Sequence, residues 1–501
     1  MSRETQPNVL FLVWDATRFD YVRDHASFLN ELREENLWFE NAYAPSTWSL
    51  PSHPSLFNGQ LPSEHGSYRV ADQRMDELPL VEAFAEQGYE TCGVSGNGFA
   101  NQRNGFDVPF DEFAYTADWG PASKGLNVTE FAYELRGGRD TITSKEIAKA
   151  SLLEALSHEY PVRSLLNFGT VLLNRVATRS SLLQRIPHPL FDSNTQYSYD
   201  PGRNTDAIKS FISEAEDPFF VFANYMDTHR PYYPRAEFRD ERTESLSYID
   251  AARLNRIAAP WEFIERTDRG EALDRELEQI RSLYAGEVAA ADHHLRQLVE
   301  FLKKNDHFED TILIVTSDHG ENLGETDFLG NRRMGHEASI SEPLLRVPLM
   351  VVHPDMEPRS VSEPVSNRRI FDFLTGLFGT EHTDVRAAED AFVTDGPVCV
   401  EYPATGGNEI YNRHPNVSRE ALGLRTSVHH SVAIDEDWLT IADSTGQRLA
   451  FENSTEQDYR DAPTALRESC EENLTRMFEA ESDDSELSQE DISQLEALGY
   501  M

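Results

Sequence analysis

Polar residues that follow apolar runs of the chain are the first candidates for chemistry. Asp15 directly follows NVLFLVW, His229 comes four residues after PFFVFANY, and Asp318 and His319 directly follow TILIVTS. Each position alone is compatible with a helix N-cap or a turn. Four such positions after three apolar runs instead predict that these side chains converge in one crevice.

Ser49 stands in the segment TWSLPSHPSLFNGQLPSEHG, which contains no Lys or Arg. The segment is either a turn-rich connection or the loop of a nucleophile, with His53 four residues after the serine. Pro45 and Pro51 flank Ser49 and stiffen its loop. We expect a helix to open just behind it, at Ser52, Pro54 and Ser55, with an N-terminus that helps to bind an anion.

The side chains of Asp15, Ser49, Asp318 and His319 form a possible metal-ligand set. Two carboxylates, one imidazole and one hydroxyl suit Mg, Mn, Ca or Zn, and the residue types do not choose among them. A divalent ion touching Ser49 Oγ would lower the pKa of the hydroxyl and make it a nucleophile at neutral pH.

The elements that must position these groups are strands alternating with helices. Continuous apolar runs predict buried strands, and segments with helical spacing predict helices between them. The strands are expected at 8–14, 89–94, 218–225, 311–317 and 347–352, and the helices at 78–88 and 276–304. This order predicts an α/β fold with a mainly parallel sheet sandwiched by helices, in which ligands bind beyond the carboxyl ends of the strands.

The pattern changes near residue 390. Short β-like pieces at 391–400 and 431–441 indicate a smaller C-terminal α+β subdomain over 391–501, which closes with an acidic tail from Glu479. We therefore expect residues 1–390 to form the catalytic domain.

Composition limits the class of protein. The 501 residues carry a net charge of −42 and only six Lys, a balance that suits molar salt and predicts a halophilic, archaeal source. Such acidity argues against nucleic-acid binding. No apolar run is long enough to span a membrane, no secretory signal is visible, and the three Cys lie far apart, which together favour a reducing cytoplasm.

Several segments, in order along the chain, resemble the sulfatase family of the alkaline phosphatase superfamily. NVLFLVWDATRFD resembles the family's opening strand, SLPSHPSLFNGQLPSEHG its nucleophile signature, and NYMDTHRPYYP its His-x-Pro-Tyr element. TSDHGENLGE, GHEASISEPLLRVPLMVV and LEALGYM resemble its second metal segment, the element after it and its ending. The resemblance implies a metal held by Asp15, Asp318 and His319 with Ser49 against it. It also implies that residues 116–200 are a variable helical insertion.

The resemblance further implies that His229 contacts the ester anion or the leaving group. His336 matches the place of a substrate-binding Lys, His53 replaces the signature Arg, and Ala16 stands where many sulfatases have a second Asp. Ser49, His229, His336 and His53 are therefore the candidate catalytic residues. Typical sulfatases oxidise the signature Cys or Ser to formylglycine, and the modifying machinery reads the Arg. With His53 at that position, an unmodified Ser49 is the alternative to formylglycine.

Three functions remain open at this point. The first is hydrolysis of a sulfate ester, with a small-molecule, glycan-linked or lipid-linked alcohol. The second is hydrolysis or transfer of a phosphoryl group by unmodified Ser49, which the missing Arg and Lys favour. The third is a non-catalytic binding protein on the same fold, which the complete set of presumed metal-site residues disfavours.

Residues 160–190 carry an unusual charge pattern. They contain four Arg and no Asp or Glu, and Val162, Leu165, Leu166, Leu172, Leu173 and Val176 recur at helical spacing. Such a basic amphipathic helix can lie on an anionic membrane surface. The alternative is an insertion helix packed on the core, with its Arg paired with carboxylates.

Overall fold

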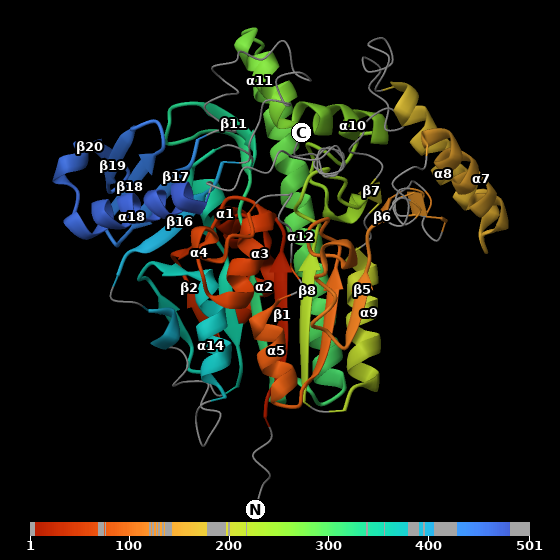
Figure 1. Cartoon of the computed structure of the whole chain (residues 1–501), viewed down its shortest axis with the longest axis horizontal. Helices are drawn as coiled ribbons and strands as arrows, with labels where there is room; N and C mark the ends of the chain where they lie inside the picture. The colour runs from red at the N-terminus through yellow and green to blue at the C-terminus, as the bar shows by residue number, and fades with distance from the viewer. Residues whose placement is uncertain are drawn as a thin grey trace, which may run out of the picture.

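The fold is given by a computed structural model. It describes residues 6–68, 75, 77–119, 122, 125–126, 128, 131–132, 135, 143–177, 197–198, 201–216, 218–336, 339–354, 356–378, 390–393, 396–404 and 428–480. Its centre is an eight-stranded sheet in the order β14-β2-β13-β9-β1-β8-β4-β5, with helices on both faces (Figure 1). The strands of this sheet are β1 (Asn8–Trp14), β2 (Leu37–Phe39), β4 (Glu90–Ser95), β5 (Glu112–Tyr115), β8 (Phe219–Tyr225), β9 (Thr311–Thr316), β13 (Leu349–Val352) and β14 (Arg359–Val361).

Five neighbouring strands, β9, β1, β8, β4 and β5, are parallel, as the apolar runs predict. The predicted strand at 347–352 is shorter than expected. Pro348 has no N–H to donate, and the segment divides there into β12 (Arg346–Val347), which pairs with β3 (Ala42–Tyr43), and β13. β13 runs antiparallel to both β9 and β2, so the sheet is mixed, with a parallel centre.

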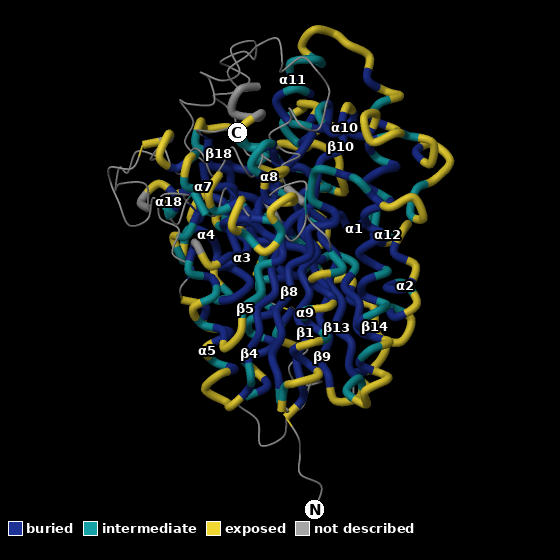
Figure 2. Tube along the Cα trace, turned by 90° about the vertical axis from the view of Figure 1, so that its right-hand side faces the viewer, coloured by how far each residue is buried: buried dark blue, intermediate teal, exposed yellow. Residues whose placement is uncertain are grey.

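The central strands are apolar throughout because both of their faces are covered. Val9, Phe11 and Val13 of β1 pack into one core, and Leu10, Leu12 and Trp14 pack into another on the opposite face. Figure 2 shows this buried centre running along the strands.

The first core is covered by α3 (Ser49–Asn58), α5 (Pro79–Glu86) and α14 (Ile370–Gly376). The second is covered by α1 (Phe19–His25), α2 (Ser27–Arg33), α9 (Pro201–Glu214), α10 (Tyr248–Ile257) and the long helix α12 (Asp274–Lys304). The predicted helices at 78–88 and 276–304 thus exist as α5 and α12. Smaller elements are α4 (Pro62–His65), α11 (Pro260–Asp268), α13 (Glu342–Leu345), β10 (Asn322–Thr326), β11 (Arg332–Gly335) and β15 (Val365–Ser366).

A second, antiparallel sheet follows near the C-terminus. It consists of β16 (Val398–Tyr402), β17 (His430–Ile434), β18 (Trp438–Asp443), β19 (Arg448–Glu452) and β20 (Thr455–Gln457), and α18 (Thr464–Ala480) packs on it. The single β-like piece predicted at 431–441 is in fact two strands joined by a turn, in which Asp435 Oδ1 accepts from the N–H of Asp437 and Trp438. Among the described residues of the piece predicted at 391–400, only 398–400 belong to a strand, β16. The acidic tail after 480 lies outside the described residues.

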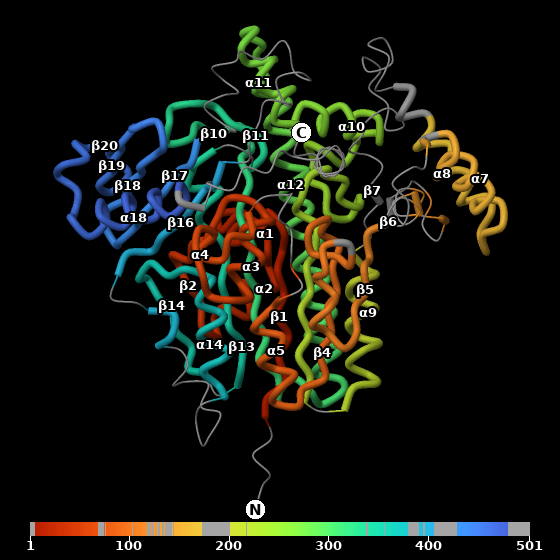
Figure 3. Tube along the Cα trace, in the orientation of Figure 1, coloured from red at the N-terminus to blue at the C-terminus, as the bar shows by residue number. Residues whose placement is uncertain are grey.

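The described residues of the region 116–200 include β6 (Asp118–Trp119), β7 (Tyr197–Ser198) and the helices α7 (Ser144–Ser157) and α8 (Pro161–Ala177). Helices α7 and α8 form a hairpin beyond the β5 side of the sheet, at the end of the molecule to which the carboxyl ends of the strands point (Figure 3). In the part of the chain that the structure describes, no helix is long and apolar enough to cross a membrane.

Candidate active site

The carboxyl ends of four neighbouring strands supply the site. Asp15 follows β1, Asp318 and His319 follow β9, Thr228 and His229 follow β8, and Asn97 follows β4. Parallel register brings these ends together although Asp15 and His319 are more than three hundred positions apart in sequence. One ligand atom each of Asp15, Asp318 and His319 lies within 4.8 Å of the others, and all three residues are buried.

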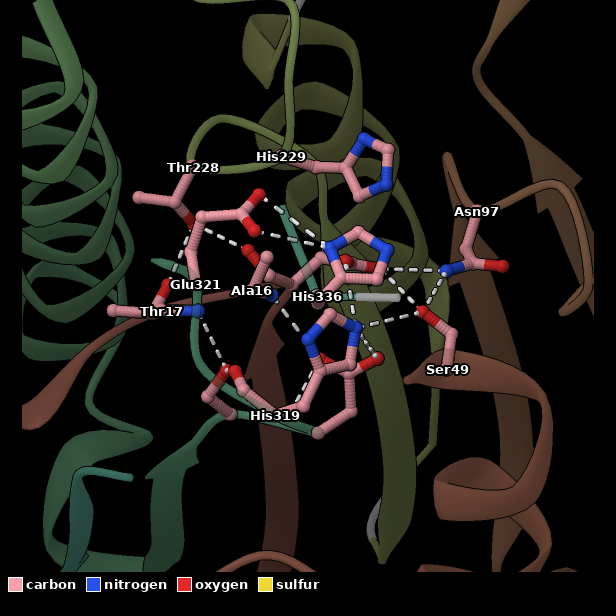
Figure 4. Close-up of polar contacts among 12 residues, drawn as sticks. Ala16, Thr17, Ser49, Asn97, Thr228, His229, His319, Glu321 and His336 are labelled. Carbon is pink, nitrogen blue, oxygen red and sulfur yellow. Dashed lines mark hydrogen bonds and ion pairs between the residues drawn. The ribbon is translucent and has the colours of Figure 1, made fainter. Parts of the chain in front are cut away.

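Ser49 completes this cluster (Figure 4). Its Oγ lies 3.4 Å from Asp15 Oδ2, 3.3 Å from His319 Nε2 and 3.1 Å from Asn97 Nδ2. The helix expected behind the serine begins earlier than predicted, because Trp48 is the extended residue before α3 and Ser49 is its first helical residue. The first N–H groups of α3 have no acceptor within the helix and favour an anion at this position.

The cluster fits a divalent metal by its unpaired oxygens. Asp15 Oδ1 and Asp318 Oδ2 are buried and accept no hydrogen bond among the described residues. Burial raises the pKa of Asp318, because a lone carboxylate is poorly solvated there. Two buried carboxylate oxygens facing the same point are costly to keep unless a cation binds them.

The imidazole of His319 is oriented for the same purpose. Its Nδ1 donates to the Gly320 carbonyl at 2.8 Å, which leaves the lone pair of Nε2 facing the carboxylates and Ser49. Burial, with His336 nearby, lowers the pKa of His319 to about 3. The ring is therefore neutral at neutral pH, the form that binds metals.

Asn97 is a site residue that the sequence reasoning missed. Its Nδ2 donates to Asp15 Oδ2 at 2.5 Å and to Ser49 Oγ at 3.1 Å, so it links the carboxylate to the hydroxyl. Its Oδ1 accepts from the N–H of Phe99, which fixes the orientation of the amide. The signal was present, because Asn97 follows a predicted strand just as Asp15 does.

His53 lies one helical turn behind Ser49 and is fully buried. Its Nδ1 donates to the Ser49 carbonyl at 2.9 Å, and its Nε2 accepts from Asn224 Nδ2 at 3.2 Å. Asn224 is a polar residue inside the apolar strand β8, and it also reaches Asp15 Oδ2 at 3.4 Å. Both ring nitrogens of His53 are therefore used to hold the serine and its neighbours.

Three imidazoles form a column from the cluster outward. The ring centroid of His336 lies 4.4 Å from that of His319 and 5.3 Å from that of His229 (Figure 4). His319 and His336 are buried, whereas His229 is half-buried. His336 thus lies beside the cluster, where a candidate catalytic residue is expected.

Glu321 stands behind His336. Its Oε1 is 3.3 Å from His336 Nδ1, and its Oε2 accepts from Tyr232 Oη at 3.1 Å. Burial raises the pKa of Glu321 to about 7. Burial, with His229 nearby, lowers the pKa of His336 well below its ordinary value, so this ring is also neutral. The sequence reasoning did not single out Glu321, although it lies two residues after His319.

The backbone after Asp15 is strained. Ala16 has φ 57°, a left-handed conformation that side chains rarely adopt. Its N–H donates to Asp318 Oδ1 at 3.2 Å, and its carbonyl accepts from Tyr284 Oη at 2.7 Å. Thr228 Oγ1 donates to the Asp15 carbonyl at 2.6 Å. This turn aims Asp15 and Asp318 at the same point, and strain held by several hydrogen bonds is typical of functional sites.

Comparisons with known proteins find relatives of the chain in sequence and in structure. A family model described as Sulfatase matches residues 7–380. Choline-sulfatase of Rhizobium meliloti (strain 1021) is 24% identical over 427 residues, which cover 80% of this chain and 74% of that protein. A protein solved in complex with its substrate D-glucosamine-2-N,6-O-disulfate has TM-score 0.60 and 14% identity, with 96% of this chain and 100% of that one covered.

The phosphonate monoester hydrolase from Silicibacter pomeroyi is also similar in structure. Its TM-score is 0.58 at 17% identity, and 95% of this chain and 94% of that one are covered. At such identities the two structures establish a shared fold. The fold therefore occurs in proteins named for sulfated and for phosphonate substrates.

Proposed function

The chain belongs to the sulfatase family, and on this premise we propose that it hydrolyses a sulfate ester at Ser49. One observation carries the proposal. The Ser49 hydroxyl stands at the start of α3 against Asp15, Asp318 and His319, whose buried ligand atoms include two unpaired carboxylate oxygens. A non-catalytic binding protein has no need to keep such a costly arrangement.

Asp15, Asp318 and His319 would hold one divalent ion, with Ser49 Oγ beside them. Such an ion, when bound, supplies positive charge to an ester oxygen and lowers the pKa of a neighbouring hydroxyl. The residues present do not choose among Ca, Mg, Mn and Zn.

The protein's own groups supply orientation and proton transfer. Asn97 Nδ2 donates to Ser49 Oγ and leaves the oxygen lone pair to face the substrate. The pKa of His336 is well lowered by burial, so at neutral pH its ring is neutral and carries no imidazolium proton to give to the leaving alcohol. His229, half-buried at the outer end of the imidazole column, is therefore the group we assign to protonate the leaving alcohol.

We propose that His53 positions Ser49 and does not touch the substrate. Its two nitrogens bind the Ser49 carbonyl and Asn224, and it lies on the helix side of the serine. His53→Gln should keep the fold and the substrate KM while lowering kcat. A raised KM with unchanged kcat would instead assign His53 to substrate binding.

A phosphoester hydrolase or phosphotransferase using unmodified Ser49 is the second candidate. The observation that favours it is the lack of a basic Arg or Lys side chain at the Ser49 hydroxyl. Asn97, His319 and the backbone-bound His53 occupy positions around it, and among the described residues no Arg or Lys contacts its hydroxyl. Serine itself is the nucleophile that phosphate-transferring relatives use.

Two measurements together test the proposal. The first is turnover of choline sulfate, D-glucosamine-2-N,6-O-disulfate and an aryl phosphonate monoester, before and after a chelator removes bound metal. Sulfate release that is lost with the metal and restored by a divalent ion supports the proposal. Turnover of the phosphonate alone supports the second candidate, and full sulfatase activity without metal contradicts both.

The second measurement is the intact mass of the peptide containing Ser49. Formylglycine is lighter than serine by the hydrogen lost on oxidation, and a trapped phosphoryl group makes the peptide heavier.

Ser55→Ala is a matched control for Ser49→Ala. Ser55 lies on the same helix, and its hydroxyl bonds to the Pro51 carbonyl and to His65, away from the cluster.

A further inference from the structure

Strand β16 of the C-terminal sheet contacts the chain just before α3. The N–H of Glu401 donates to the Pro45 carbonyl at 3.0 Å, and Ser46 Oγ donates to the Glu401 carbonyl at 2.7 Å. Ser46 is fully buried and stands three residues before Ser49. The backbone of one residue in β16 therefore fixes the place where the chain enters α3.

The side chain of the same residue binds the helix that follows α3. Glu401 Oε2 accepts from the Ser63 N–H at 2.7 Å, and Oε1 accepts from Ser63 Oγ at 2.7 Å. Ser63 is the second residue of α4, where a backbone N–H has no acceptor within the helix. Only residues 59–61 separate α3 from α4. Glu401 thus holds the α3–α4 segment at both of its ends.

The C-terminal helix α18 also lies beside α4 (Figures 1 and 2). Its Arg476 pairs with Glu64 at 2.5 Å, but the two side chains are 39% and 35% exposed, and such pairs add roughly 0–1 kcal/mol. Glu401 differs, because its side chain is fully buried and burial raises its pKa to about 7. A buried carboxylate adds little to stability, but its hydrogen bonds hold their partners in one geometry.

The Ser49 hydroxyl and the carboxylates that face it belong to different layers of the fold. Asp15 and Asp318 directly follow strands of the central sheet, whereas Ser49 is the first residue of α3. The distance between the hydroxyl and the carboxylates therefore depends on how α3 is placed over the sheet. A shift of about 1 Å at a reacting group can lower a rate about a hundredfold.

We propose that Glu401 is a positioning residue for Ser49. Through its backbone and its side chain, the C-terminal sheet sets the position of α3, and with it the Ser49 hydroxyl, relative to Asp15 and Asp318. The C-terminal subdomain thereby takes part in the reaction through a residue that bonds to neither the hydroxyl nor the carboxylates. The kinetic consequence of this inference rests on the proposed function, and its structural consequence does not.

Substitutions at Glu401 and at its partner test the kinetic consequence. Glu401→Ala removes both side-chain bonds, and we expect kcat to fall about tenfold to a hundredfold with KM little changed. Glu401→Gln should keep most of the wild-type kcat, because its amide can accept from the Ser63 N–H and donate to Ser63 Oγ. Ser63→Ala keeps one of the two bonds and should have an intermediate effect.

Hydrogen exchange tests the structural consequence without any substrate. In Glu401→Ala, the amides of residues 50–57 should exchange at least about tenfold faster than in the wild type, and Glu401→Gln should restore slow exchange. Leu466→Ala is the matched control. Leu466 is buried between α18 and the C-terminal sheet, so its loss should lower the melting temperature without lowering kcat or exposing α3.

Two outcomes would overturn the proposal. The first is a Glu401→Ala variant with wild-type kcat and wild-type exchange in α3. The second is a Leu466→Ala variant that changes kcat and α3 exchange as much as Glu401→Ala does, because Glu401 would then act only through the stability of the subdomain. If Glu401→Ala does not fold, Ser63→Ala decides by the same two measurements. A wild type that cleaves no sulfate ester contradicts the proposed function, and the exchange of α3 still tests the role of Glu401.

Discussion

The Ser49 cluster and the α7–α8 hairpin depart from ordinary burial in opposite directions. At the ends of β1 and β9, the protein buries two carboxylates, and one oxygen of each accepts no hydrogen bond from the described part of the chain. On the hairpin, it exposes leucines and buries serine and asparagine. Neither arrangement adds to the stability of the isolated chain. The two regions therefore differ in what accounts for them: a bound cation would account for the buried carboxylates, whereas the exposed leucines leave apolar surface in contact with solvent.

The largest expected effect comes from Asp318. Asp318→Asn should lower turnover by about a thousandfold or more, since the cluster loses a ligand charge. It should not lower the melting temperature of the metal-free protein, because burial raises the pKa of Asp318 and its charge opposes folding. Calorimetry of both proteins in chelator checks this. A clear loss of stability would show that Asp318 is structural and would break the comparison.

Asn97 should have a smaller effect. Asn97→Ala removes hydrogen bonds to Asp15 and Ser49, and bonds to charged groups contribute about 1.5–3 kcal/mol each. We expect kcat to fall about tenfold to a hundredfold, with KM little changed. Asn97→Asp keeps the shape but adds a charge beside Asp15 and should be worse. Steady-state kinetics of both variants test this prediction. A kcat equal to that of the wild type in both variants would remove Asn97 from the mechanism.

The buried imidazoles predict that the free energy of unfolding depends on pH. The folded-state pKa of His336 lies well below 6.5, so the unfolded state binds the proton first and stability falls as pH drops below about 6.5. Each such group contributes a slope of up to about 1.4 kcal/mol per pH unit. His336→Gln should make this slope shallower in metal-free protein, as measured by denaturant unfolding between pH 7 and 5. An unchanged slope would contradict the burial of a neutral His336.

Ala16 should show the strain at the site. A residue at φ 57° costs roughly 1–2 kcal/mol in the left-handed region, and glycine does not bear this cost. Glycine also has more freedom to lose on folding, so we expect Ala16→Gly to stabilise the protein by about 0.5–1 kcal/mol. Ala16→Val is the contrasting variant and should destabilise. If glycine gave no gain in unfolding free energy, the turn would be relaxed.

The smallest effect is expected on the hairpin. Leu153→Ser should change the free energy of unfolding by no more than about 0.5 kcal/mol, because Leu153 is 57% exposed. Ala155→Leu, at a buried position two residues away, should destabilise by about 1–3 kcal/mol through overpacking. A large cost for Leu153→Ser would mean that the exposed leucines of the hairpin pack within the protein, and the comparison would fail.

Much of the fold could be predicted from sequence because its central strands are buried on both faces. That condition demands apolar runs, and the runs at β1, β8 and β9 are correspondingly plain. The edge elements were harder. The start of β13 is set by Pro348, and the division between β17 and β18 is set by the turn at Asp435. Each shifts the ends of a strand by a few residues and leaves the overall apolar pattern of the segment unchanged.

Some residues of the candidate site could likewise be predicted from the sequence, and others could not. Asp15, Asp318 and His319 directly follow apolar runs, so their convergence could be expected from parallel topology. Asn97 also follows a predicted strand, but the sequence does not show its partners or those of Glu321, because the packing of neighbouring elements supplies them. The polarity of the hairpin was also hidden, because a helical repeat of leucines does not say which face meets the protein.

The parallel centre of the sheet also governs how the site can open. Asp15, Asn97 and Asp318 are fixed to β1, β4 and β9, and β1 bonds to strands on both sides. Local fraying of loops cannot separate them, so these groups part only when the innermost strands unfold. Amide protons of Leu10–Val13 should therefore exchange with deuterium at the rate of global unfolding. Amide protons of the hairpin should exchange much faster. The residues of the candidate site would then open only on global unfolding, whereas the hairpin would open often by local unfolding.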